Sequence, residues 1–445
     1  MVGDEPSQGA YQRPNNTGII YLSIFDYQRI NMDSCSHPEL MPLDEAQSYL
    51  VKQLPIIASP KFSSYQQSLG FYLASTAKAS SPIPSFANSA MDGYAFAYEN
   101  LTKYDTLTVT QQILAGDIHR YEISAGECAQ IMTGAPMPIG ADTVIMQEQT
   151  SRTANQLTLH HQPKLGANVR HPGETVKQGQ IVAQVGDTIS AAHIGLFASI
   201  GLAQVNYYQP ITVGLFSTGD ELRAPGSELE FGQIYDSNRA MLQAMLKSLP
   251  VKVIDYGVLP DNLSAIIDLL KKANHECDVI ISSAGVSVGH ADFTKDALET
   301  LGQIAFWKVA MKPGKPFAFG RLSDSYFFGL PGNPVSAAVT FLQLVVPALR
   351  KLGGGREHQP QRWPAKASVS FKKHPGRVDF QRAIAEVDEQ GQWHVRPAGT
   401  QSSATLASFI EANCFAVLEQ ERGPIQAGEM VSIEMIPSLL RYSIY

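Results

Sequence analysis

The chain has 445 residues, of which 44% are hydrophobic, and a chain of this length is expected to form about three domains. Its 41 acidic and 34 basic residues give a net charge of -7, which argues against binding nucleic acid through the phosphate backbone. The four cysteines form no CxxC pair, and no apolar run approaches the ~20 residues that cross a bilayer. We therefore expect reduced thiols and a cytoplasmic protein with no membrane partner.

The first half of the chain predicts three segments. Residues 1–39 are polar and rich in turn formers; we expect this N-terminal extension to be disordered and assign it no function. The helical spacing of Leu43, Ala46 and Leu50 predicts ordered structure from about residue 40. Alternating apolar and polar residues, with turns between them, predict a β-rich domain at 86–170.

The second half predicts an α/β core followed by a second β-rich domain. The apolar runs "ITVGLFS", "VKVIDYGV", "CDVIISS" and "YFFGL" alternate with helical segments over residues 210–358. Such alternation predicts a parallel-type sheet covered on both faces, a three-layer core. After "GGGREHQP" the pattern returns to short strands, which predicts a C-terminal β-barrel at 359–445.

A loop of mostly glycine and other small residues, "SSAGVSVGHAD", follows the predicted strand "CDVIISS". Ligands of open α/β sheets bind at the carboxyl ends of the strands, where this loop is expected. Gly285 and Gly289 would let backbone N–H groups approach an anion such as phosphate. A strand-to-helix turn without a ligand is the alternative explanation for the loop.

Further polar residues are predicted at the same edge of the sheet. Helix capping accounts for Asp236, Ser237, Asn238 and Asn333 individually, and a solvated hairpin accounts for the lysines of "MKPGKPFAFG". Carboxylates beside lysines and a glycine loop suit a phosphate-bearing ligand with Mg²⁺. The residues that would supply this chemistry are Asp220, Glu221, Asp292, Lys312 and Lys315.

Several standard fingerprints are absent from the sequence. It contains no GxGxxG and no GxxxxGK[ST], which counts against a dehydrogenase and a P-loop kinase. In the β-rich domain, Asp92 of "NSAMDGYAF" and Thr133 of "IMTGAPMPIGAD" stand out, although ordinary turns would explain both.

Taken together, these segments resemble the molybdopterin molybdenumtransferase family, the MoeA-type enzymes related to gephyrin E domains. The matching segments occur in family order: "NSAMDGYA", "IMTGAPMPIGAD", "STGDEL", "GQIYDSN", "SSAGVSVGHAD", "KVAMKPGKPFAFG", "LPGNPVSA", "GRVDFQRA" and "NCFAVL". The resemblance implies an elongated linking domain formed by 40–85 and 171–209, in addition to the insertion, the core and the barrel. It also implies a homodimer whose active cleft lies between the insertion of one chain and the core of the other.

The resemblance implies a reaction and a set of site residues. Adenylylated molybdopterin would be hydrolysed with Mg²⁺, AMP released, and molybdate inserted at the dithiolene to give molybdenum cofactor. The implied catalytic residues are Asp92, Thr133, Glu221, Asp261 and Asp292, with Glu221 and Asp292 holding the metal. The implied substrate-binding residues are Ser282, Gly285, Ser287, Gly289, Lys308, Lys312, Lys315, Pro331 and Asn333, and the implied molybdate-binding residues are Arg377, Ser402 and Ser403.

Two departures from the family pattern keep alternatives open. Ala284 stands where the family usually has a glycine, and His290 where it usually has a glutamate. One alternative is a molybdopterin adenylyltransferase, since its fold resembles the isolated core; another is a non-catalytic molybdopterin-binding scaffold. For Arg377, a surface ion pair with Asp379 is the alternative. Possible partners are the adenylyltransferase and molybdoenzyme apoproteins.

Overall fold

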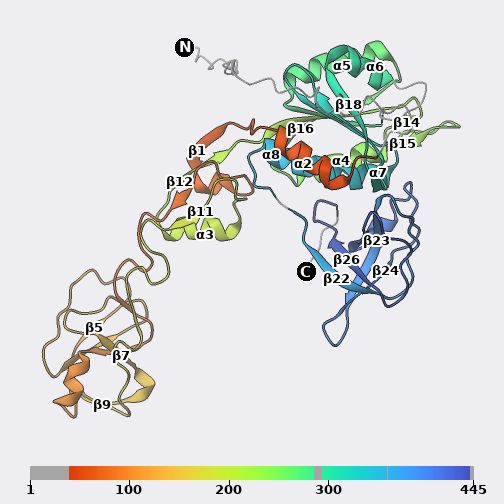
Figure 1. Cartoon of the computed structure of the whole chain (residues 1–445). Helices are drawn as coiled ribbons and strands as arrows, with labels where there is room; N and C mark the ends of the chain where they lie inside the picture. The colour runs from red at the N-terminus through yellow and green to blue at the C-terminus, as the bar shows by residue number, and fades with distance from the viewer. Residues whose placement is uncertain (1–39, 285–292, 358, 441–445) are drawn as a thin grey trace, which may run out of the picture. The chain divides into compact units, whose positions relative to one another are not determined.

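The computed structural model describes residues 40–284, 293–357 and 359–440 (Figure 1). The extension to which no function was assigned, and most of the glycine loop, lie outside the described residues.

Three antiparallel strand pairs join the segment before the β-rich insertion to the segment after it. Their pairing is long-range, because each strand finds its partner across the whole insertion. A helix, α3 (Ala191–Ser199), begins at a capping box in which Ser190 and His193 satisfy each other's backbone N–H groups. The pairs are β1 (Pro60–Ser64) with β12 (Gln204–Tyr208), β2 (Ala77–Lys78) with β11 (Ile181–Ala183), and β3 (Asn88–Ser89) with β10 (Val169–Arg170).

The insertion forms one six-stranded mixed sheet, as the alternating sequence predicts. Both faces are covered by apolar clusters, one around Phe96 and Leu107 and the other around Ile113 and Ile131. The strands, in spatial order, are β7 (Thr143–Met146), β4 (Gly93–Phe96), β6 (Glu127–Ile131), β5 (Leu107–Ile113), β9 (Gln156–Leu159) and β8 (Thr150–Thr153).

The α/β core is a six-stranded mixed sheet. Its first four strands are parallel, as predicted, and its last two run antiparallel and contain the lysine-rich hairpin. In spatial order they are β16 (Val251–Leu259), β13 (Ile211–Thr218), β17 (Val279–Ser283), β21 (Tyr326–Leu330), β20 (Pro316–Arg321) and β18 (Gln303–Lys308). The carboxyl ends of the parallel strands meet at one edge, together with the start of β20 and the end of β18.

Helices cover both faces of this sheet, which confirms the predicted three layers (Figure 1). Alternate strand residues face opposite sides: Val213 and Leu215 pack on one group of helices, whereas Phe216 and Ile280 pack on the other. The first group is α2 (Leu43–Gln53), α4 (Ser237–Lys247), α7 (Pro334–Thr340) and α8 (Val346–Leu352), and the second is α5 (Leu263–Glu276) and α6 (Phe293–Leu301). The first predicted helix, α2, thus shares its core with the α/β sheet.

The helical stretch from Pro334 to Leu352 is long and apolar enough to cross a membrane by length and composition, contrary to our expectation from the sequence. However, 72% of its most apolar window is buried inside the protein, as in the central helix of a packed core. A π-helical turn, η4 (Phe341–Val345), separates α7 from α8 and carries the buried Gln343.

The C-terminal region contains a closed five-stranded barrel. The chain of pairings runs β23 (Val378–Val387), β24 (Trp393–Pro397), β22 (Arg362–Ala367), β26 (Met430–Met435) and β25 (Cys414–Leu418), and β25 pairs again with β23. A short strand, β19 (Met311–Lys312), extends from the α/β core and pairs in parallel with the start of β23. The core and the barrel also share one apolar cluster.

The cysteines among the described residues are thiols. Cys128, Cys277 and Cys414 are buried and unbridged, in agreement with the sequence-based expectation.

Candidate functional site

Three carboxylates gather where β13 and β16 end. The backbone N–H of Asp261 donates a hydrogen bond to Asp220 Oδ1 at 3.1 Å. The carboxylate of Glu221 lies over Gly219, whose φ is +150° and where an added Cβ would come within 2.6 Å of Glu221 Oε2. Burial, followed by the nearby charges of Asp220 and Glu221, raises the pKa of Asp261. A cation at this edge would relieve the repulsion among the three groups.

The donor set at this edge is compatible with Mg²⁺. Magnesium prefers oxygen ligands, and it usually binds through one or two carboxylates together with waters and substrate phosphates. Among the residues that the structure describes, no group of three His, Cys, Asp or Glu side chains converges into a metal cage. Asp292, expected to hold the metal beside Glu221, lies outside the described residues. The carboxylates therefore suit a metal shared with a phosphate better than a site made of protein alone.

The described part of the glycine loop begins with a constrained alanine. Ala284 has φ +74°, in the left-handed region that favours glycine, and its N–H donates to the carbonyl of Leu330 at 3.1 Å. The Ser282 side chain is fully buried, and its hydroxyl donates to the carbonyl of Ala284 at 3.2 Å. Ser282 thus shapes the start of the loop. The expected phosphate-binding residues Gly285, Ser287 and Gly289 lie outside the described residues.

The loop after β21 reaches the same edge. Pro331 is buried, and Asn333 occupies the N-cap position of α7 with Pro334 next to it, as predicted. The Asn333 side chain is exposed and makes no capping hydrogen bond, so it is available to a ligand. The capping alternative is correct for Asp236, which accepts a hydrogen bond from the N–H of Arg239 in α4.

Two buried polar groups have an unpartnered oxygen: Asn238, which the sequence suggested only as a helix cap, and Ser217, which the sequence analysis did not single out. Asn238 donates from Nδ2 to the carbonyl of Gly332 at 2.7 Å, while its Oδ1 has no hydrogen-bond partner. The hydroxyl of Ser217, at the end of β13, is also unpartnered, and its side chain is fully buried. Both residues lie in sequence segments discussed above, but a sequence does not show whether a buried polar atom finds a hydrogen-bond partner.

The lysine-rich hairpin connects the α/β core to the barrel. Lys308 ends β18, where its carbonyl accepts a hydrogen bond from the N–H of Met41, and Lys315 is exposed. Lys312 lies in β19 opposite Asp379 of β23, and its Nζ is 3.3 Å from Asp379 Oδ2. Asp379 is only 4% exposed at its side chain, whereas that of Lys312 is 45% exposed. The lysine is held by one buried carboxylate and still reaches solvent.

The three residues expected to bind molybdate lie on two loops at this end of the barrel. Arg377 is partly exposed and precedes Asp379, whose ion pair is with Lys312, so the surface pair considered for Arg377 is replaced by a pair between domains. Ser402 is exposed, and the carbonyl of Ser403 accepts a hydrogen bond from the N–H of Val335 in α7. The Ser402–Ser403 loop therefore lies next to the loop that carries Asn333.

Asp92 and Thr133 of the insertion are brought together across 41 residues of sequence. Thr133 donates to Asp92 Oδ1 twice, from its backbone N–H at 2.7 Å and from its hydroxyl at 2.8 Å. These two bonds, the backbone one first, lower the pKa of Asp92. Within the described part of the chain, no hydrogen bond or ion pair joins this pair to the residues of the strand edge.

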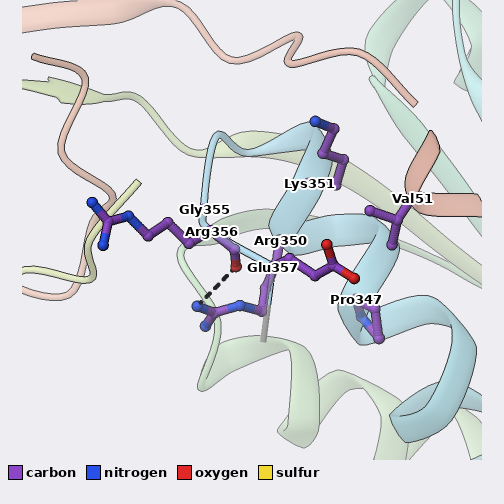
Figure 2. A pocket seen from close by; sticks show the side chains of 7 residues that line it. All are labelled: Val51, Pro347, Arg350, Lys351, Gly355, Arg356 and Glu357. Carbon is purple, nitrogen blue, oxygen red and sulfur yellow. Dashed lines mark hydrogen bonds between the residues drawn. The ribbon is translucent and has the colours of Figure 1, made fainter. Parts of the chain in front are cut away.

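A pocket beside the linker that follows α8 is lined by none of these residues (Figure 2). Figure 2 shows Arg350 donating to the carbonyl of Arg356, while the Arg350, Lys351 and Arg356 side chains point in different directions. Arg356 binds Asp187 and the carbonyl of Val185 instead of turning into the pocket. The pocket therefore offers no converging set of charges.

The sheet, the strand-edge carboxylates and the attached barrel define a class: a multidomain α/β protein with polar residues along the carboxyl edge of its sheet and a barrel joined to the lysine hairpin of that edge. Three family models match the chain in order, the MoeA N-terminal region (domain I and II) at 41–201, a probable molybdopterin binding domain at 214–351, and the MoeA C-terminal region (domain IV) at 364–436. The chain belongs to the molybdopterin molybdenumtransferase (MoeA) family.

Individual relatives agree with this assignment. A molybdopterin molybdenumtransferase of Haemophilus influenzae is 44% identical over 403 residues, which cover 90% of this chain and 100% of that protein. One from Nostoc sp. is 34% identical and covers 83% of this chain and 87% of its own length. The crystal structure of a molybdopterin biosynthesis MoeA protein from Pyrococcus horikoshii OT3 superposes with a TM-score of 0.77 at 27% identity, covering 89% of this chain and 100% of that one.

Proposed function

We propose that this protein is a molybdopterin molybdenumtransferase that acts on adenylylated molybdopterin. It cleaves the phosphate linkage to AMP with the help of Mg²⁺ and inserts molybdenum from molybdate at the dithiolene. Family membership and a relative with this name at 44% identity over its whole length support the transferase. The adenylylated substrate and the metal are supported by the chemistry of the site.

The contact between Lys312 and Asp379 carries this proposal. It joins a cationic hairpin of the core to the barrel loop that carries Arg377, so oxyanion-binding groups of two domains lie together. Lys312 and Arg377 each lower the pKa of a third cation, Lys373, so both lie within electrostatic range of it. Arginine and lysine donors around one position suit a tetrahedral dianion such as molybdate.

The opposite end of the edge suits the phosphates and the metal. Glu221 and Asp261, with Asp292, would hold Mg²⁺ through their carboxylate oxygens. When bound, Mg²⁺ would neutralise charge on the phosphate oxygens and so favour P–O cleavage. Asn333 and the glycine loop, which follow the central strands β21 and β17, would bind the substrate between this end and the barrel.

We further propose that the Asp92–Thr133 pair completes the site of a second copy in a cytoplasmic homodimer. The Asp92–Thr133 pair is exposed on the insertion, and the two hydrogen bonds from Thr133 lower the pKa of Asp92 and so favour its charged form. An exposed, prearranged carboxylate that, among the described residues, is bound to no side chain of another domain suits contact with another molecule. The adenylyltransferase that supplies the substrate and the apoproteins that accept the product are further proposed partners.

The decisive experiment measures AMP release from adenylylated molybdopterin by the full-length protein with Mg²⁺, with and without molybdate. Lys312→Met is compared with Lys103→Met, since Lys103 is another partly exposed lysine paired with a carboxylate, Glu99, but lies on the insertion. Molybdate-dependent AMP release that is lost in Lys312→Met and kept in Lys103→Met is the expected result.

Other outcomes would replace the proposal. Consumption of ATP with molybdopterin as the acceptor would identify an adenylyltransferase. Binding of the substrate without AMP release under any condition would identify a scaffold. Equal loss of activity in the two lysine variants would remove the special role given to Lys312.

A further inference from the structure

Two cations at the rim of the barrel are almost completely buried. Arg382 of β23 is 1% exposed and Lys373 is 2% exposed, and both are among the largest fully buried side chains of the described residues. Burying a cation is costly unless its donors are satisfied. The partners that satisfy these two side chains show what the burial achieves.

Arg382 is bound to the loop that carries Ser402. Its Nη2 donates to the carbonyls of Thr400 at 3.1 Å and Ser402 at 3.0 Å, and its Nε donates to Ser408 Oγ at 3.1 Å. The backbone at this position adds two more links, since the N–H of Arg382 donates to Gln401 Oε1 and the Gln401 amide donates back to the Arg382 carbonyl. The planar guanidinium therefore fixes both ends of a short loop.

Lys373 holds the turn that carries Arg377. Its ammonium donates to the carbonyls of His374 at 2.9 Å, Arg377 at 2.7 Å and Gln420 at 3.3 Å, so all three donors are used on backbone. Desolvation lowers the pKa of Lys373, whereas the charge of Asp379 raises it. The ammonium closes the turn from inside and leaves the Arg377 side chain partly exposed.

The charges at the rim do not balance locally. Asp379 is the buried carboxylate there; its Oδ2 is shared between Lys312 at 3.3 Å and the amide of Gln381 at 3.1 Å. Among the described residues, Arg382 and Lys373 donate their hydrogen bonds to neutral oxygens, which are backbone carbonyls and the Ser408 hydroxyl, although the charge of Asp379 acts on both cations and that of Glu421 on Lys373. Neutral donors could have tied the same loops at lower desolvation cost.

We propose that Arg382 and Lys373 are positioning residues for the oxyanion site, which hold the Ser402 loop and the Arg377 turn in place and supply positive potential from beneath. This inference rests on the proposed function, because it takes molybdate as the anion. Neither side chain touches the anion. Their effect is exerted through the loops and through charge, as the outer partners of a ligand site commonly act.

The test compares Arg382→Lys, which keeps the charge and loses the fork, with the full-length wild type. The matched control is Arg396→Lys, since Arg396 lies in the same barrel but is half exposed and paired with Glu386. Binding of inorganic molybdate is measured by calorimetry, and the half-saturating concentrations of molybdate and of adenylylated molybdopterin are measured separately. Hydrogen exchange of residues 400–405 reports on the loop itself.

We expect Arg382→Lys to weaken molybdate binding about ten-fold, at the lower end of typical outer-partner effects, and to leave half-saturation by adenylylated molybdopterin unchanged. Exchange at 400–405 should rise in this variant and not in Arg396→Lys. Lys373→Met should weaken molybdate binding as well, with faster exchange around Arg377 instead.

Three results would overturn the inference. They are unchanged molybdate binding in Arg382→Lys, equal weakening for both substrates together with loss of thermal stability, or unchanged exchange at 400–405. If the wild type itself binds no molybdate, the proposed oxyanion site fails, and the exchange experiment still decides separately whether Arg382 fixes the loop.

Discussion

Replacing Ala284 by glycine should stabilise the strand edge. Ala284 has φ +74°, and a left-handed backbone costs a residue with a Cβ about 1–2 kcal/mol. Glycine removes this cost, but it also gives the unfolded chain more freedom, which offsets about 0.4–1 kcal/mol. The methyl group is partly exposed, so little packing is lost. The expected net gain in the free energy of local opening is therefore about 0.5–1 kcal/mol.

Hydrogen exchange is the suitable assay, because a single unfolding free energy is not defined for a multidomain chain. Exchange in β17 (Val279–Ser283) and β21 (Tyr326–Leu330) should slow by about 2- to 5-fold in Ala284→Gly, as the gain of about 0.5–1 kcal/mol implies. Ala154→Gly is the positive control, since Ala154 has φ +55° in the turn between β8 and β9 and should slow exchange only there. Ala318→Gly, at a buried position of β20 that pairs with β21, should speed exchange. Unchanged or faster exchange in Ala284→Gly, while Ala154→Gly slows its own hairpin, would refute the strain argument.

Two further predictions follow from the titrating groups. Burial raises the pKa of Glu434 despite the hydrogen bond from Gln343. The charged carboxylate therefore destabilises the folded state at pH values above the folded-state pKa, and this cost disappears as the pH falls below the ordinary pKa of 4.5. The free energy of local opening of β26 (Met430–Met435) in Glu434→Gln should therefore equal that of the wild type or exceed it by up to about 1 kcal/mol at pH 7, with no advantage at pH 4. Hydrogen exchange of β26 at the two pH values checks this, and clearly faster exchange than in the wild type at pH 7 would contradict it. Thr133→Val removes one of the two hydrogen bonds to Asp92 and should raise the pKa of Asp92, so the acidic limb of the pH–activity profile should move to higher pH. Turnover should fall by less than the ~100-fold cost of losing a positioned acid or base. An acidic limb that does not move would show that the ionisation of Asp92 does not affect the reaction.

The α/β core was predictable because its signals are local and mutually consistent. Continuous β-branched strands separated by amphipathic helices specify a parallel sheet, and β13, β16, β17 and β21 form as expected. The closing of the barrel and the pairing of β19 with β23 depend on contacts far apart in sequence, for which the alternating pattern gives no register. The pairing of the segments on either side of the insertion came from family resemblance, not from spacing.

The candidate site was predictable as a set of residue types and less so as a set of contacts. Asp92 and Thr133 meet directly, but they lie 41 positions apart in the sequence and nothing between them indicates that bond. Asp379 was considered only as a partner of Arg377, since the two are neighbours in sequence, whereas the structure pairs it with Lys312. Buried cations such as Arg382 look like surface residues in a sequence, because only the fold decides whether the donors of a side chain meet carbonyls or water.

The order of strands in the core sheet limits the ligand that can use the whole edge. The carboxylates follow β13 and β16, whereas the lysine hairpin borders β20 and β18 on the other side of β17 and β21. With neighbouring strands about 4.8 Å apart, the three steps from β13 to β20 amount to about 14 Å. At this separation the carboxylates cannot form ion pairs with the lysines of the hairpin, and Lys312 forms its ion pair with Asp379 instead. A free phosphate or molybdate is too small to engage both ends, so the edge as a whole favours an elongated ligand with phosphates toward one end and a second anion-binding centre toward the other, as adenylylated molybdopterin with molybdate would provide.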